Sequence, residues 1–63
     1  MMEFTNVDDR LVSINITKVD SFQELEYSQQ DKKITVVSIA GTTYFLRVEY
    51  NEFKRQYRLY NGQ

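Results

Sequence analysis

The sequence predicts a single β-rich α+β domain over residues 1–63, built as a small antiparallel meander of about five strands, curled or barrel-like, with one C-terminal helix. Three observations predict this class. Short runs of alternating or β-branched apolar residues, separated by turn signals, fill the first two-thirds of the chain. From Asn51 onward, the apolar spacing becomes that of a helix. A chain of 63 residues also has room for only one domain.

The first two strands are expected to form a hairpin. Apolar and polar residues alternate over residues 4–7 and again over residues 11–14. The polar triplet Asp8-Asp9-Arg10 between these runs is typical of a turn. The pattern therefore predicts two short antiparallel strands joined by that turn.

The third strand is expected within residues 19–27. The apolar residues at both ends of this run share one parity, whereas Phe22 has the other. A change of parity inside one strand indicates a β-bulge, which we place near residues 21–23. The polar block that follows, residues 28–33, is the clearest loop signal in the chain.

The strongest strand signal covers residues 34–40, which are rich in β-branched side chains. Gly41-Thr42 is expected to turn the chain back into a fifth strand over residues 43–48. With Gly41 as the first loop residue, the expected turn is type II′, because that position requires a positive φ.

The C-terminal helix is expected over residues 51–60. Asn51 is a favourable N-cap, and Asn61-Gly62 is a typical C-terminal stop. Three aromatic residues of the segment fall within about 60° of arc on a helical wheel. They are Phe53, Tyr57 and Tyr60. A helix this short is unstable alone in water, so we expect this aromatic side to dock on the sheet.

The two best strands carry apolar residues on both faces. Val36 points opposite to Val37, and Phe45 points opposite to Tyr44 and Leu46. One helix can cover only one face of a sheet. The other face is therefore either closed by curling into a small barrel or covered by a second subunit. Because a domain of this size has a thin core, we expect a homo-oligomer.

Composition excludes most catalytic and metal chemistry. The chain has no Cys and no His, which removes disulfides, thiolate and imidazole metal sites, and serine nucleophiles activated by an imidazole. Its two glycines, Gly41 and Gly62, stand too far apart to form a glycine-rich phosphate loop. We therefore expect no enzyme activity, no catalytic residue, no metal site and no cofactor.

A cytoplasmic location is expected. No apolar run approaches the roughly 20 residues that cross a bilayer. The first residues lack the basic and apolar regions of a signal peptide, and the absence of Cys agrees with a reducing compartment. We accordingly expect no contact with a membrane.

Protein binding is the function that this sequence favours. Tyr and Arg are enriched at the centres of protein interfaces. The candidate contact residues are Tyr44, Phe45, Arg47 and Tyr50. A small domain without catalytic chemistry is either a self-associating or adaptor module or an inhibitor that blocks a larger partner, as phage and bacterial accessory proteins do. The residues leave the choice between these roles, and the partner, open.

Nucleic-acid binding is the alternative function. Lys54, Arg55 and Arg58 share the helix side opposite the aromatic residues, and Arg47 is near in sequence. Such a basic face is able to contact phosphates. The sequence pI of about 5.2 argues against it, because dedicated nucleic-acid binders are usually basic.

Overall fold

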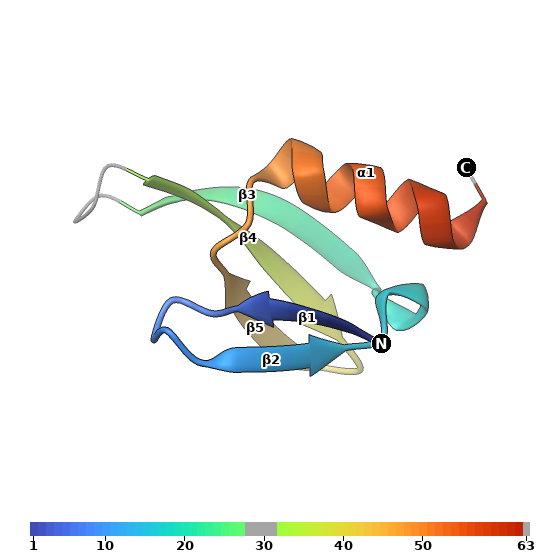
Figure 1. Cartoon of the computed structure of the whole chain (residues 1–63), viewed down its shortest axis with the longest axis horizontal. Helices are drawn as coiled ribbons and strands as arrows, with labels where there is room; N and C mark the ends of the chain where they lie inside the picture. The colour runs from blue at the N-terminus through green and yellow to red at the C-terminus, as the bar shows by residue number, and fades with distance from the viewer. Residues whose placement is uncertain (28–31, 63) are drawn as a thin grey trace.

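The fold is that of the predicted class, β-rich α+β with one C-terminal helix (Figure 1). A computed structural model describes residues 1–27 and 32–62. The elements in chain order are β1 (Met2–Thr5), β2 (Leu11–Ile14), the 3₁₀ turn η1 (Ile16–Lys18), β3 (Ser21–Tyr27), β4 (Lys32–Ile39), β5 (Thr42–Leu46) and α1 (Tyr50–Asn61). Residues 32 and 33, predicted as part of a loop over residues 28–33, belong to β4, and residues 28–31 lie outside the described part.

The strands form two antiparallel sheets rather than one meander. One sheet is β1–β2, and the other has the order β3–β4–β5. They meet at a single bridge between Asn6 and Leu46, flanked by hydrogen bonds from the Val7 N–H to the Phe45 C=O (3.1 Å) and from the Arg47 N–H to the Thr5 C=O (2.8 Å). The structure is thus curled but not closed into a barrel, and the meander prediction is correct only within each sheet.

The break in the meander lies between β2 and β3, where η1 turns the chain away from β2. The side chain of Asn15 holds this turn, because its Oδ1 accepts hydrogen bonds from the Thr17 N–H (3.1 Å) and the Thr17 hydroxyl (2.6 Å). Such a local bond offers the backbone an alternative to continued strand pairing. β3 consequently pairs with β4 and not with β2.

The predicted hairpin of β1 and β2 is present, and the side chain of Asn6 organises its turn. The Asn6 Oδ1 accepts from the backbone N–H groups of Asp8 (2.9 Å) and Arg10 (3.0 Å). Asp9 adopts a left-handed φ of 63°, a conformation that Asp tolerates better than most residues. The turn is therefore stabilised by Asn6 as well as by the polar triplet that follows it.

The predicted bulge near residues 21–23 is wrong. β3 and β4 pair one to one from Ser21 opposite Ser38 to Tyr27 opposite Lys32. The parity change arose from counting Val19 as part of the strand. Val19 instead caps η1, and the strand begins only after Asp20.

The turn between β4 and β5 is type I′, and the predicted type II′ turn is wrong. Its two central residues, Ala40 and Gly41, both have positive φ, 51° and 84°, and the pair of Ile39 with Thr42 flanks them. The carboxylate of Asp20 secures this turn by accepting the Ala40 N–H at 2.8 Å. Ala40 is therefore held in a backbone region that costs an L-residue with a Cβ roughly 1–2 kcal/mol.

We expect Ala40→Asn to stabilise the protein. Asn enters the left-handed region more readily than Ala, and Asn-Gly is the preferred pair for a type I′ turn. The gain should be about 0.5–1 kcal/mol, seen as a rise of a few degrees in Tm. Thermal unfolding followed by circular dichroism measures it, with Ala40→Val, whose branched side chain tolerates positive φ poorly, as the destabilised comparison. An unchanged or lower Tm for Ala40→Asn would contradict the strain that we assign to Ala40.

The core lies where α1 spans the open side between the two sheets (Figure 1). Phe53 is fully buried, and its ring centroid lies 5.5 Å from that of Phe4 on β1 and 5.0 Å from that of Phe22 on β3. Buried Val37 and Leu46 complete this centre from β4 and β5. One aromatic ring on the helix thereby joins both sheets.

The helix differs from its expected form at two points. It begins at Tyr50 after Glu49, which makes no side-chain cap, so Asn51 belongs to the first turn and is not the N-cap. Tyr60, expected to dock on the sheet, is 57% exposed. The reason is that Phe22 reaches only Tyr50, Phe53 and Tyr57, so the last turn extends beyond the aromatic contacts. The predicted stop is present, with Gly62 in the left-handed conformation.

Candidate protein-binding surfaces

One face of the β3–β4–β5 sheet points away from the core. Residues paired across antiparallel strands share a face, so the register places Leu25 beside Ile34 and Val36 beside Phe45 on this side. Leu25 is 38% and Phe45 42% exposed, whereas Ile34 is buried. We call this side the outer face; by the register its members are Ser21, Gln23, Leu25, Tyr27, Lys32, Ile34, Val36, Ser38, Thr43 and Phe45. Lys32, at the end of the face where β4 begins, is the charged member of this set, and the other nine residues carry no charge.

The four residues predicted to contact a partner do not form one cluster. Tyr44 lies on the inner face of the sheet, partly buried against the core. Phe45 lies on the outer face, exposed. Tyr50 is in the first turn of α1, where its ring packs against Phe22 with centroids 5.4 Å apart. Of these three aromatic residues, Phe45 alone is exposed.

Arg47, the fourth candidate, is directed to the turn between β1 and β2. Its Nε lies 3.4 Å from the Asp9 carboxylate, and its Nη2 donates to the Val7 C=O at 3.2 Å. The Nε itself is buried and makes no hydrogen bond with a described residue. Arg47 therefore connects the end of β5 to the β1–β2 turn, and it is separate from the cations of the helix.

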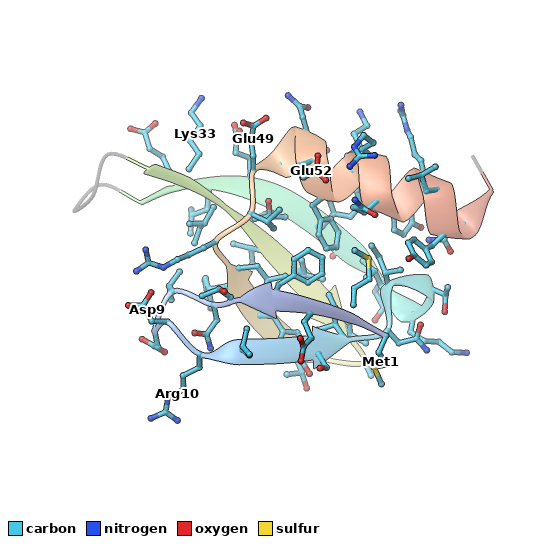
Figure 2. The ribbon with its side chains drawn as sticks, viewed as in Figure 1. Met1, Asp9, Arg10, Lys33, Glu49 and Glu52 are labelled. Atoms are coloured by element: carbon cyan, nitrogen blue, oxygen red, sulfur yellow. The ribbon has the colours of Figure 1, made fainter. Side chains whose placement is uncertain are left out.

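The cations of α1 do share one side of the helix, as predicted. Lys54, Arg55 and Arg58 line a shallow groove together with Asn51, Leu59 and Gly62. Figure 2 shows Glu49 and Glu52 at the start of this helix, across the molecule from Asp9 and Arg10. The basic side of α1 and the turn of the β1–β2 hairpin are thus remote from each other.

The groove cations differ in how strongly they are already paired. Arg55 makes two hydrogen bonds to the Glu52 carboxylate, at 3.1 Å and 2.7 Å, and the Gln56 amide donates a third at 3.0 Å. The bonds from Arg55 and then Gln56 lower the pKa of Glu52, and the same carboxylate raises the pKa of Arg55. The Lys54 ammonium lies 5.9 Å from the centroid of the Tyr50 ring. Arg58 forms no ion pair with any residue in the described ranges.

The sequence reasoning missed Leu25 and Leu59. Leu25 belongs to the outer face because it pairs with Ile34, and only the register reveals that pairing. Leu59, 65% exposed, lies in the basic groove of the helix. Leu59 follows Arg55 by four residues, and residues at this spacing are neighbours on a helix surface. The sequence was therefore sufficient to place Leu59 beside the basic residues.

The described residues contain neither a carboxylate cluster suited to a metal ion nor a membrane-spanning helix. Within residues 1–27 and 32–62, no group of three or more carboxylates is close enough to hold a metal ion. No helix among them combines the length and the apolar character needed to span a membrane.

No protein-family model matches the chain, and neither a curated protein nor a solved structure shows significant similarity to it.

Proposed function

We propose that this chain is a cytoplasmic, non-enzymatic protein-binding module that associates with a second copy of itself through the outer face. The observation that supports this proposal is an apolar and partly exposed stretch of sheet face whose residues, apart from Lys32 at its end, carry no charge. Charged residues are depleted at the centres of interfaces. Away from Lys32, the outer face also meets its own copy without like-charge repulsion.

The free edge of β3 is a poorer surface for self-association than the outer face. β3 is an edge strand, and its midpoint is Glu24, with Glu26 two residues further along the same strand. Antiparallel pairing of two β3 strands about their midpoint would set Glu24 opposite its own copy, which is destabilising. Acidic residues on an edge strand commonly prevent such pairing. Stacking of two outer faces, with sheets about 10 Å apart, avoids this conflict.

The expected dimer is weak. Full burial of a Leu or Phe side chain contributes about 1.5–3 kcal/mol, and Leu25 and Phe45 still expose only 38% and 42% of their surface. Association itself costs at least about 4 kcal/mol. We therefore expect weak association, with a dissociation constant near the millimolar range, roughly −4 kcal/mol.

Phe45→Ser should lower the dimer fraction without unfolding the domain. Its matched control is Leu11→Ser, which removes an exposed apolar side chain from β2, outside the outer face. Sedimentation equilibrium from about 10 μM to about 1 mM measures the dimer fraction, and circular dichroism checks the fold. We expect concentration-dependent dimers for the unaltered chain and for Leu11→Ser, and mostly monomer for Phe45→Ser. An unaltered chain that stays monomeric at the highest concentration would overturn the proposal.

A further inference from the structure

The solvent side of α1 carries a continuous stripe of side chains. Its members are Asn51, Lys54, Arg55, Arg58, Leu59 and Gly62, which line the groove along the helix. They are spaced three and four residues apart, so they lie one above another on the same side. The buried ring of Phe53 points to the opposite side, into the core. We call this set the basic stripe, and it is separate from the outer face of the sheet.

The basic stripe is positive in a chain whose net charge is −1. It contains three cations and no acid. Glu52, beside it, binds Arg55 through two hydrogen bonds and so neutralises that one cation. Lys54 and Arg58 make no salt bridge with a described residue, and their charges remain available to an anionic partner.

An apolar residue lies among these cations. Leu59 is 65% exposed and lines the same groove as Arg55 and Arg58. A partner that presents only phosphates gains nothing from Leu59, whereas an acidic polypeptide with an apolar side chain uses both features. In the stripe, Lys54 and Arg58 are the cations that make no salt bridge with a described residue, and two such cations are few for a long phosphate backbone. The observations therefore favour a polypeptide over a nucleic acid.

We infer that the basic stripe is a docking site for an acidic polypeptide segment. Carboxylates of that segment pair with Lys54 and Arg58, and an apolar side chain between them packs on Leu59. The charge complementarity fixes the chemistry of the partner, and the length of α1 limits the contact to a short segment. This inference does not depend on dimer formation through the outer face.

The test uses a fluorescent synthetic peptide of repeated Glu-Glu-Leu, as long as α1, with the full chain as its binding partner. The comparison probes are the same peptide with every Glu replaced by Gln, and single-stranded oligothymidine. Fluorescence anisotropy at low and at physiological salt gives the affinities. We expect the Glu peptide to bind most tightly, with an affinity that falls as salt rises. Equal binding of the Gln peptide, tighter binding of oligothymidine or no binding at low salt would each overturn the inference.

Charge-reversal variants locate the site. We expect the double variant Lys54→Glu and Arg58→Glu to weaken binding of the Glu peptide by about tenfold or more. The matched control is Arg10→Glu, an exposed cation in the β1–β2 turn, across the molecule from the stripe (Figure 2). It should change the affinity by less than about twofold, because a distant exposed charge is screened by salt. Leu59→Ser should weaken binding and leave its salt dependence unchanged. An equal loss in Arg10→Glu would overturn the site, since it would indicate attraction to overall charge.

Discussion

Phe53→Ala is expected to lower the free energy of unfolding by about 3–5 kcal/mol. The ring is fully buried and contacts Phe4 and Phe22, which belong to different sheets. Its removal leaves a cavity where the helix and both sheets meet. For a chain of 63 residues, the total stability is about 3–9 kcal/mol, so the loss removes a large part of it. We expect a much lower urea midpoint, and a variant that is unfolded at 25 °C where the stability of the unaltered chain is below about 5 kcal/mol.

Urea unfolding followed by tyrosine fluorescence and circular dichroism measures this loss. Tyr60→Ala is the matched control, because it removes an aromatic ring from the same helix at a position that is 57% exposed. Its effect should be within about 0.5 kcal/mol. Phe53→Leu, which keeps most of the apolar volume, should be folded and intermediate in stability. A Phe53→Ala variant as stable as Tyr60→Ala would show that the ring does not join the sheets as described.

The elements of this fold were largely predictable because their signals are local. Alternation and β-branched residues located the strands, and the spacing of Phe53 and Tyr57 located the helix and the side that is buried. Gly62 ended the helix as expected. Each of these signals depends on residues within one or two turns, or within one strand.

The pairing of the elements was not predictable in the same way. Alternation shows which residues share a face, but it does not show which strand lies beside which. The turn at Asn15 separates β2 from β3, and its signal is one Asn–Thr hydrogen-bond pair that also occurs in ordinary loops. Two further differences also depend on contacts between residues distant in sequence. Tyr60 extends beyond Phe22, and the left-handed Ala40 is bonded to Asp20, the residue before β3.

For the candidate surfaces too, the sequence predicted what depends on local spacing but not what depends on strand faces. The basic side of the helix followed from spacing alone, and the structure keeps Lys54, Arg55 and Arg58 together. The four residues predicted to contact a partner were grouped because they are close in sequence. In a strand, however, neighbours point to opposite faces, so Tyr44 and Phe45 are separated by the sheet itself. On a helix, residues three or four apart share a surface. In a strand, adjacent residues do not, because their side chains point to opposite faces.

Thr35→Val is the second substitution with a large expected effect. Thr35 is fully buried in the middle of β4, and its hydroxyl donates a 2.7 Å hydrogen bond to the Val48 C=O. Val48 lies in the short connection between β5 and α1. Valine keeps the shape of threonine but has no donor, so the Val48 carbonyl would lose its partner. The loss of a buried bond of this kind costs about 1–3 kcal/mol.

The variant Thr35→Ser distinguishes the contribution of the hydrogen bond to stability from that of methyl packing. Serine keeps the hydroxyl and loses only a methyl group, a loss of about 1 kcal/mol. If the hydrogen bond holds the connection in place, Thr35→Val is the less stable of the two in urea unfolding. Amide hydrogen exchange adds a local measure, because the Phe53 N–H, bonded to the Glu49 C=O at 2.9 Å, lies in the first turn that this connection positions. We expect faster exchange there in Thr35→Val than in Thr35→Ser. The reverse order in both measurements would mean that Thr35 stabilises β4 through its methyl group, and that α1 is positioned by the ring of Phe53 alone.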